Sequence, residues 1–421
     1  MALRSAIHWI RPLLRDERGN ALMFTALAMP LLIGCAGLAV DTIKWVYTKR
    51  DLQAAVDAAA MAGVYGILQN GDVNVAVDRS LASRPGLDKK RAVSAEQSPT
   101  GHEDDPFAVR VRVTSAAKLF FSSMFLRQAP AISATATATV VETGKFCAFA
   151  VGTGAETGIT IKPGADVQME CGIAANSPSQ QGIKADGTLT ATRVASYGGM
   201  VGEGIKSPGV RRYALRQKDP LAKTEPPLIP NTGCPNVMVN PDAAKLNNGR
   251  LALEPGCYGN MVVNGPVFLK DGEYILSRGS LLVGPTGEIS CRSCTIFLTS
   301  DEPLSDPGSI GKVKIDHHAK VKLTAPSQGP NAGILIYQDR HAGNDHDGAE
   351  NIIGGNSFSE LKGLVYLPAE TIRIDGENAP DVQCARFLGK RLIFQGKVMI
   401  ADSCSSANIM NFRGTEVKLV S

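Results

Sequence analysis

The feature that most constrains this chain is its one long uncharged apolar run, residues 21–40 (ALMFTALAMPLLIGCAGLAV). A helix of that length spans about 30 Å, the thickness of the hydrocarbon core of a bilayer. The run therefore predicts a single transmembrane helix. The alternative is a cleaved secretory signal. The run is long for a signal core, and the residues DTIKWVY that follow it lack the small residues of a cleavage site. We therefore expect an uncleaved anchor.

Charges beside this run indicate its orientation. The basic residues that precede it are Arg4, Arg11, Arg15 and Arg18, and the charged residues that follow it are Asp41, Lys44, Lys49 and Arg50. The bias toward basic residues on the N-terminal side favours a cytoplasmic N-terminus. Residues 1–20 are then a cytoplasmic lead, and everything after residue 40 is exported.

Composition narrows the class of the exported part. The chain of 421 residues carries 44 basic and 40 acidic side chains, a small imbalance that gives no reason to expect a nucleic-acid partner. It has 43 glycines and 24 prolines, which indicate many turns and disfavour an all-helical protein.

Cysteine usage agrees with export. Cys35 lies inside the apolar run, and the even number that remains is typical of disulfides in an oxidising compartment. Their clustering suggests four local pairs, although eight cysteines allow 105 connectivities. The CxxC motif gives only weak support to zinc or redox chemistry. The sequence has no second CxxC or ordered His pair that would complete a zinc site, and no βαβ pattern surrounds the motif as in redox proteins. The expected pairs are Cys147–Cys171, Cys234–Cys257, Cys291–Cys294 and Cys384–Cys404.

A helical pattern continues beyond the apolar run to about residue 68. Within it, Ala55, Ala59 and Gly63 recur every four residues, and such spacing lets another element approach the helix closely. Two interpretations stay open. The stripe packs on its own domain, or it packs laterally against other subunits.

The same segment resembles a known family. Residues 18–65 look like the N-terminal segment of TadG-like proteins of the Flp (tight adherence, Tad) pilus machinery. The residues that carry the resemblance are Arg18-Gly19-Asn20-Ala21, the 27–30 stretch LAMP, the 37–41 stretch GLAVD, Tyr47, Leu52-Gln53 and the 57–63 stretch DAAAMAG. The resemblance implies a bitopic protein of the bacterial inner membrane with a large region in the periplasm or at the cell surface.

One residue departs from the pattern of fibre subunits. Prepilins of this system and TadE-type pseudopilins carry Glu five residues after the cleaved Gly, and counting from Gly19 this position is Phe24. Since TadG-like proteins usually lack that carboxylate, the departure fits an anchored accessory protein rather than a polymerising subunit.

Residues 41–143 are expected to form a pilin-like α/β unit. The stretch FAVRVRV at residues 107–113 alternates strictly, as does ISATATATVV at residues 132–141, and both predict half-buried strands. A long helix laid on a few antiparallel strands follows from this pattern. The resemblance to TadG-like proteins extends through the KLFFSSMF segment at residues 118–125 that separates the strands.

Residues 146–421 are expected to be a disulfide-stapled exported β domain, which makes the whole chain mostly β (α+β). Short β-type runs of three to five residues recur between Gly, Pro, Asn and Asp turns. They favour a right-handed parallel β-helix, with a β-sandwich as the alternative because no strict repeat length emerges. The proline-rich segment at residues 211–235 is interpreted as an exposed excursion. The resemblance continues in the 323–326, 333–339 and 363–368 stretches.

The chain offers little chemistry. Asp339, Asp345 and Asp347, with His341 and His346, are weak metal candidates in a segment whose composition also suits an exposed turn. The pair at residues 317–318 is interpreted as solvated histidines. No nucleophile elbow, phosphate-binding loop or zinc-protease motif is present, so no catalysis and no cofactor are expected.

Together these features predict a structural, non-enzymatic, pseudopilin-like accessory protein that assembles or anchors Flp/Tad pili. Its expected partners are the lipid bilayer, other membrane proteins of the pilus machine and pseudopilins. A pilus-associated adhesin and a membrane-tethered β-helix that binds or cleaves carbohydrate remain the alternatives. The second alternative would use a surface glycan, and an aromatic content of only 5% argues against it.

Overall fold

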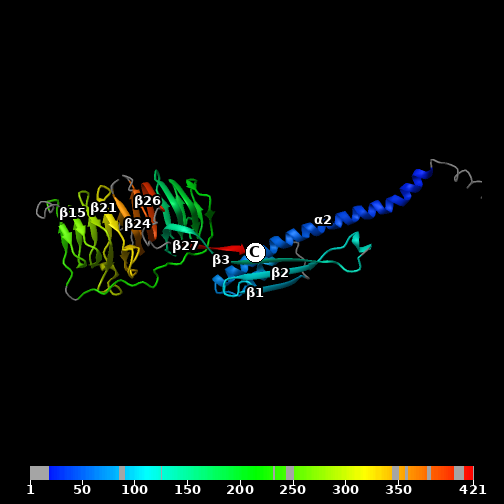
Figure 1. The fold of residues 1–421 in the computed structure, drawn as a ribbon, viewed down its shortest axis with the longest axis horizontal. Helices are drawn as coiled ribbons and strands as arrows, with labels where there is room; N and C mark the ends of the chain where they lie inside the picture. Colours follow the sequence, from blue (N-terminus) through cyan, green and yellow to red (C-terminus); the bar gives the residue numbers. More distant parts are fainter. Residues whose placement is uncertain are drawn as a thin grey trace, which may run out of the picture. The chain divides into compact units, whose positions relative to one another are not determined.

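The computed structural model describes residues 19–84, 91–124, 126–230, 233–242, 251–343, 350–355, 359–376, 381–402 and 412–420. These fall into two compact units (Figure 1). Unit 1 comprises Met1–Val141 and Val417–Ser421, and unit 2 comprises Glu142–Glu416. The chain passes between the units twice, so its last residues group with unit 1 rather than with the β domain expected at residues 146–421.

Unit 1 places one long helix on an antiparallel sheet. The helix α2 contains the whole predicted span and continues without a break, with Pro30 inside it. Strand β2 pairs antiparallel with β1 and with the first half of β3. The elements of unit 1 are α2 (Gly19–Leu68), α3 (Val73–Ala82), β1 (Ala92–Gln97), β2 (Val109–Ala116), the 3-10 turn η1 (Ser122–Met124), β3 (Ala131–Ala150) and the end of β27 (Phe412–Val420).

The core of unit 1 follows from two sequence periods. Alternate residues of β2 are buried, as the FAVRVRV pattern predicts, and they face the second half of α2. Val109, Val111 and Val113 are each fully buried there. The half of α2 that carries Leu52 and Val64 packs on the sheet, while the half before it does not.

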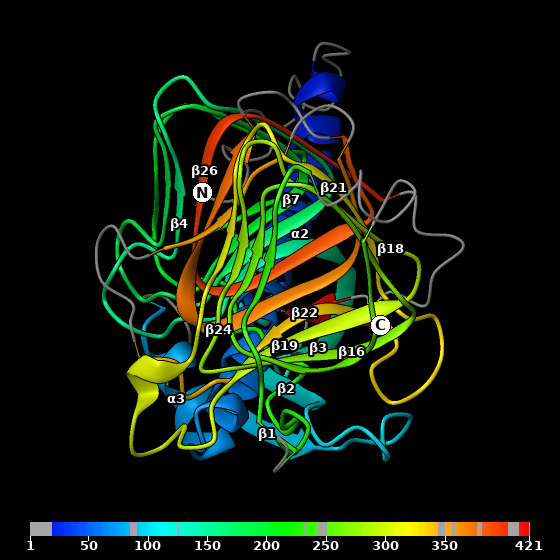
Figure 2. The same cartoon turned by 90° about the vertical axis from the view of Figure 1, so that its left-hand side faces the viewer.

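Unit 2 consists of short strands that pair in parallel. Figure 2 looks along the stack, where strands of successive turns overlie one another. The strands are β4 (Ile159–Ile161), β5 (Asp166–Ala175), β6 (Ile183–Ala185), β7 (Thr188–Ser196), β8 (Met200–Val201), β9 (Ile205–Lys206), β10 (Val210–Arg211), β11 (Val237–Val239), β12 (Leu251–Leu253), β13 (Gly256–Tyr258), β14 (Met261–Val263), β15 (Pro266–Leu269), β16 (Gly272–Ser277), β17 (Leu281–Val283), β18 (Glu288–Cys291), β19 (Cys294–Thr299), β20 (Val313–Ile315), β21 (Lys320–Thr324), β22 (Ile334–Gln338), β23 (Asn351–Ile353), β24 (Glu360–Gly376), β25 (Asp381–Gln383) and β26 (Ala385–Ala401), with a 3-10 turn η2 (Pro307–Ser309).

From β11 to β21, each strand pairs with the third strand after it. Strand β11 pairs with β14, β14 with β17 and β17 with β20, and two further columns start at β12 and β13. Residues in register form apolar ladders inside the stack, such as Met261, Leu281 and Val313, all fully buried. Parallel strands of three residues with a buried–half-buried–buried pattern therefore build one continuous core.

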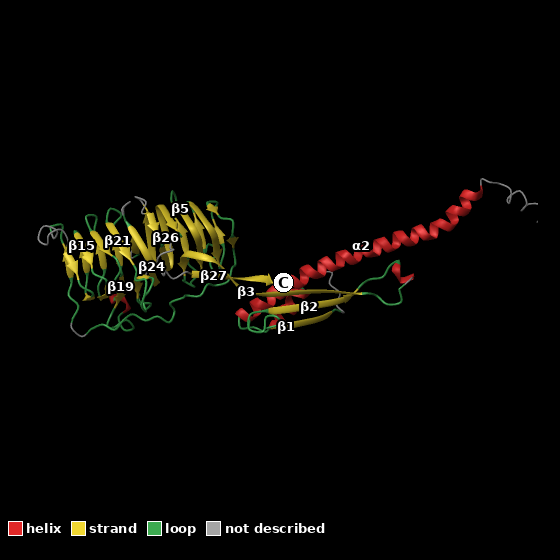
Figure 3. Cartoon of the chain, viewed as in Figure 1, coloured by secondary structure: helices red, strands yellow, loops and turns green. Residues whose placement is uncertain are grey.

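The order of the coils in space differs from their order in the sequence. Strand β26 pairs with β24 on one side and with β3, β4 and β5 on the other. The chain thus enters the stack in its middle, and strands β3 to β10 form the part from there to one end. It then starts again at the opposite end with β11 and returns to the middle. We call the described residues of the connecting segment, 212–230 and 233–236, the strap; Figure 3 shows it in green along the stack.

The strap is held against the stack at several points. It covers an outward-facing ladder of Phe297, Tyr337 and Tyr366, whose neighbouring ring centroids lie 5.7 and 5.0 Å apart. Leu221 of the strap is only 3% exposed, in the same cluster. The Tyr366 hydroxyl donates to Asp219 at 2.8 Å. Burial, with the Asp219 carboxylate, raises the pKa of Tyr366.

This arrangement corrects the interpretation of the segment as an exposed excursion. Prolines do keep it out of the sheets, but its described part is anchored by side chains of the coils. Leu228, in contrast, is 95% exposed, so the anchoring is confined to part of the strap.

Candidate functional site

The first half of α2 is an apolar cylinder with almost no protein around it. Met23–Leu68 is long and apolar enough to cross a membrane by length and composition. Its large apolar side chains are exposed, and Phe24 is 72% exposed. These side chains are Met23, Phe24, Leu27, Met29, Leu31, Leu32, Ile33, Leu38 and Val40. A helix that is apolar on all sides and unpacked is typical of a membrane span.

The end of this apolar half is marked by a buried carboxylate. Asp41 follows the run directly and is 0% exposed. Its Oδ2 accepts hydrogen bonds from the Ser122 hydroxyl at 2.5 Å, the Ser122 N–H at 2.7 Å and the Phe120 N–H at 3.3 Å. These donors belong to the segment between β2 and β3, of which the structure describes residues 117–124 and 126–130, and we call these described residues the β2–β3 loop. A polar group without water is tolerated when such bonds replace its hydration.

Three more contacts join the β2–β3 loop to α2. The Trp45 indole N–H donates to the Lys118 carbonyl at 3.2 Å. The Lys44 ammonium lies 3.6 Å from the centroid of the Phe120 ring. Phe121 packs on Gly37, where an added Cβ would stand 2.7 Å from the Cβ and Cγ of Phe121. Only glycine leaves room for this approach, so the GLAVD stretch supplies both the gap and the carboxylate that receives the loop.

The loop holds its apolar side chains outward. Phe120 and Phe121 are 52% and 47% exposed, and Met124 is 81% exposed. Figure 3 shows the loop with its short 3-10 turn reaching past the strands alongside α2. An exposed cluster of this kind next to an exposed apolar helix marks a surface that some other phase or molecule covers.

The small-residue stripe of α2 is used within unit 1. Ala55 and Ala59 are 1% and 0% exposed, in the core with the valines of β2. A Cβ added at Gly63 would lie 2.8 Å from Val109 Cγ1. Of the two interpretations, burial favours packing on the chain's own domain. The described residues of this stripe leave no surface for lateral packing on another subunit.

Three of the expected cysteine pairs are disulfides in the structure: Cys147–Cys171, Cys234–Cys257 and Cys291–Cys294. Cys384 is buried, and its expected partner Cys404 lies outside the described residues.

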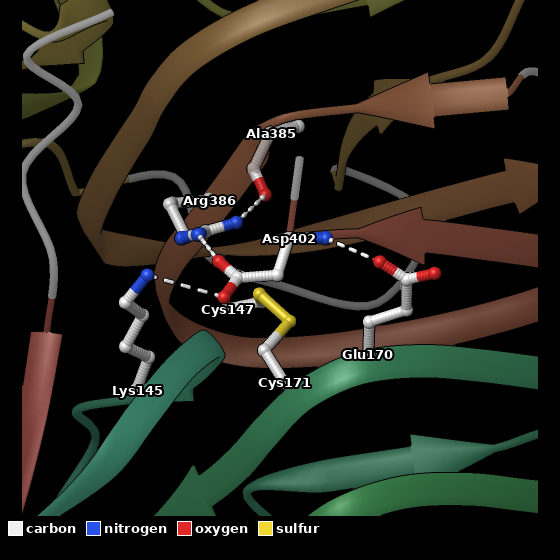
Figure 4. Close-up of a disulfide and its surroundings, with 7 residues drawn as sticks. All are labelled: Lys145, Cys147, Glu170, Cys171, Ala385, Arg386 and Asp402. Atoms are coloured by element: carbon white, nitrogen blue, oxygen red, sulfur yellow. Dashed lines mark hydrogen bonds and ion pairs between the residues drawn. A yellow bond between two sulfur atoms is a disulfide. The ribbon is translucent and has the colours of Figure 1, made fainter. Parts of the chain in front are cut away.

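The Cys147–Cys171 disulfide links neighbouring coils beside a partly exposed ionic network (Figure 4). Asp402 is the centre of this network. It accepts from Arg386 at 2.5 Å and from Lys145 at 3.2 Å, and its own N–H donates to Glu170 at 2.9 Å. The Arg386 side chain is wholly buried, so this ion pair is shielded from solvent on one side.

The predicted metal candidates are not assembled into a site in the described part of the chain. Asp339 is 1% exposed and its oxygens accept from the Thr299 hydroxyl at 2.9 Å and the His341 N–H at 3.0 Å. Its carboxylate therefore stabilises a turn. Asp345, His346 and Asp347 lie outside the described residues.

A different group does bring metal-type donors together. One ligand atom each of Asp316, His317 and His318 lie within 4.8 Å of one another. A carboxylate and two imidazoles are a donor set for a transition metal. The three residues are consecutive on a turn where Asp316 and His317 are half-buried and His318 is exposed, and Asp316 already accepts from the His318 N–H at 2.8 Å. The solvated-pair interpretation of the two histidines thus overlooked their shared carboxylate.

Sequence reasoning also missed the contact between Asp41 and the β2–β3 loop. The signals for it were an acidic residue directly after an apolar span and a second apolar segment, KLFFSSMF, between two predicted strands. The sequence does not indicate that these two segments contact each other, because 81 residues separate Asp41 from Ser122.

Residues 19–67 match the family model described as putative Flp pilus-assembly TadE/G-like. This segment is a TadE/G-like domain. It covers α2 from its start to the penultimate residue and nothing of unit 2. The family is a pilus-assembly component and not a known class of enzyme. The match to a pilus-assembly family thus covers the segment that contains the candidate membrane helix.

Comparison with other proteins adds little. The chain is similar to the crystal structure of the competence-associated pilin ComZ from Thermus thermophilus, with 9% sequence identity, coverage of 88% of this chain and 98% of that chain, and a TM-score of 0.23. A score this low carries no argument about the fold. No curated protein matches the sequence.

Proposed function

We propose that this chain is a single-pass, pseudopilin-like accessory protein that assembles or anchors Flp/Tad pili in the bacterial inner membrane. The proposal rests on the difference in exposure between the two halves of one continuous helix, α2. Its first half is exposed and apolar, and its second half is buried in a sheet of its own unit. The family match covers this same helix.

Further residues support a membrane-held role over a fibre subunit. Phe24 occupies the position where polymerising subunits carry Glu. The basic residues before α2 favour a cytoplasmic N-terminus, which leaves everything after residue 40 in the periplasm or at the cell surface. The proposed partners are the bilayer, membrane proteins of the pilus machine and pseudopilins.

For unit 2 we propose a right-handed parallel β-helix. The parallel pairings with a step of three strands support it, because each coil then supplies one strand to each of three columns. An antiparallel sandwich would need hairpin pairings, and the strands from β4 to β26 pair in parallel. The disulfides between neighbouring coils stabilise such a thin stack.

The carbohydrate alternative receives no support from the aromatic ladder beneath the strap. Sugar-binding surfaces use exposed aromatic rings, whereas Tyr337 and Tyr366 are fully buried beneath the strap. The role proposed for unit 2 is therefore structural.

The test is a count of surface pili by electron microscopy in a strain that lacks this chain. We expect pili to be lost, and to return when the intact chain is supplied. A matched variant, Leu31→Asp with Leu32→Asp, places charges in the exposed apolar half of α2 and should not restore them. Normal pili without the chain would contradict the proposal and leave the adhesin alternative.

A further inference from the structure

We propose that the β2–β3 loop is a second membrane contact: its apolar tip enters the bilayer beside α2, in the leaflet at the Asp41 end of the span. The inference rests on the proposed membrane span of α2. The inference adds a lipid-binding surface to unit 1. Lipid would cover the exposed side chains of the loop, with acyl chains around its tip and headgroups around its base.

The depth of the loop follows from its contact with α2. Phe121 packs on Gly37, which lies inside the apolar run at residues 21–40. At 1.5 Å per residue, Gly37 is about 5 Å inside the end of that run. Whatever medium surrounds the last turn of the run must therefore also surround the Phe121 side chain.

The chemistry of the loop changes along its length as a membrane interface requires. Phe120, Phe121, Met124 and Leu126 are between 41% and 81% exposed and form its tip. Lys118 and Arg127 flank this tip and are exposed as well. Apolar side chains bracketed by basic ones suit acyl chains next to anionic headgroups.

The bonds between the loop and α2 stabilise one oxygen of a carboxylate at this depth, while the other oxygen, Oδ1, is buried and makes no hydrogen bond within the described residues. An ionised group next to hydrocarbon is costly unless its hydrogen bonds are made. The loop brings the Ser122 hydroxyl, Ser122 N–H and Phe120 N–H to Asp41. Trp45, one turn later, donates to the loop, and tryptophan is typical of the interfacial region.

The apolar face of α2 also extends past Asp41. Ile43, Val46 and Tyr47 are 56%, 48% and 62% exposed, at a spacing that puts them on one side of the helix. The loop and this stretch of α2 occupy the same segment of the helix axis. Continuity with the proposed span favours lipid over a separate protein as the occupant of the tip.

The experiment places a nitroxide spin label on the full chain in nanodiscs of phosphatidylethanolamine and phosphatidylglycerol. Met124→Cys carries the label in a Cys35→Ala background, and unsubstituted Cys35→Ala is the labelling blank. Met124 is chosen because its exposure allows substitution without repacking. Ser94→Cys in the same background is the exposed control on β1, and native Cys35 in the parent chain reports on the span itself.

Power-saturation accessibility to oxygen and to a water-soluble nickel chelate separates the outcomes. We expect the label at position 124 to be exposed to lipid, with high accessibility to oxygen and low accessibility to the nickel chelate. The label at the control position 94 should be accessible to the nickel chelate. Nickel access at 124 with a lipid signature at Cys35 would overturn the loop proposal and leave the span intact. Low access to both reagents at 124 would also overturn it, because another protein chain would then cover the tip. Nickel access at Cys35 would refute the span.

Discussion

At the scale of single residues, Asp41 shows how one side chain joins two distant segments. The carboxylate directly follows the proposed membrane span, where the surrounding lipid would solvate it poorly. The structure gives it three donors from the β2–β3 loop on one oxygen. Three further contacts join the loop to α2, but Asp41 accepts the most hydrogen bonds from it, so we expect the position of the loop to depend strongly on this residue.

Replacing Asp41 should therefore release the loop. In Asp41→Ala, the Ser122 and Phe120 donors lose their acceptor. We expect faster tryptic cleavage after Lys118 and Arg127 in the full chain in nanodiscs, measured by mass spectrometry. Asp51→Ala changes an exposed carboxylate on the same helix and is the matched control. Equal cleavage rates in the two variants would mean that the carboxylate does not hold the loop.

A second residue, Gly63, allows a test of how closely α2 packs on its sheet. Gly63→Leu places side-chain atoms where Val109 and Val77 already are, and should destabilise unit 1 by about 1–3 kcal/mol through overpacking. Ala54→Leu adds the same side chain at an exposed position of α2 and should stay within about 0.5 kcal/mol. Both tryptophans of the chain precede residue 50, so chemical unfolding followed by tryptophan fluorescence reports on this unit. An unchanged midpoint in Gly63→Leu would place the stripe at a surface.

At the scale of elements, the strap is the segment whose role depends on distant partners. It connects the two ends of the stack and lies over a ladder of aromatic side chains from β19, β22 and β24. Arg340 donates to the Leu221 carbonyl at 2.6 Å, and the Tyr337 hydroxyl donates to the Thr224 carbonyl at 2.5 Å. These bonds satisfy strap carbonyls that no sheet could pair.

Two leucines of the strap allow a matched test of this anchoring. Leu221→Ala removes a side chain from the aromatic cluster and should cost unit 2 about 2–5 kcal/mol. Leu228→Ala removes an exposed one and should change stability by less than about 0.5 kcal/mol. Denaturant unfolding followed by circular dichroism measures both. Equal effects would show that the strap is not packed on the stack.

Disulfides of different loop length provide a second test on elements. Cys147 and Cys171 are 24 residues apart, whereas Cys291 and Cys294 are 3 apart. Chain-entropy arguments give about 3.5 kcal/mol for the longer loop and about 2 kcal/mol for the shorter. Replacing each pair by Ala should thus lower the unfolding free energy of unit 2 more for the first pair. The reverse order would indicate that native packing, not loop closure, dominates.

Local features of the sequence were predictable because their causes are local. The FAVRVRV alternation became β2, and the apolar run became the exposed half of α2. The three described disulfides join cysteines at most 24 residues apart. The contact of Asp41 with Ser122, the burial of Leu221 and the placement of β26 between β24 and β5 depend on long-range pairing. Periodicity and spacing carry no signal for such pairings.

At the scale of the whole molecule, the chain combines an exposed apolar helix with two folded units, and it returns to the first unit at its end. Val417 packs against the core that α2 and β2 form. Unit 2 is therefore covalently connected to unit 1 at both of its ends, through β3 and through β27. Such a double connection suits a domain held at the membrane by one helix.

The most direct test of the central claim is the location of the chain after pili are sheared from cells. The sheared fibres and the washed membranes are probed for the chain by immunoblotting, with the pilin as the marker for fibres. A membrane-held accessory protein should remain with the membranes, resist extraction by high salt and be released by detergent. Recovery of the chain in the sheared fibres, in a constant ratio to pilin, would contradict the account and make it a component of the fibre.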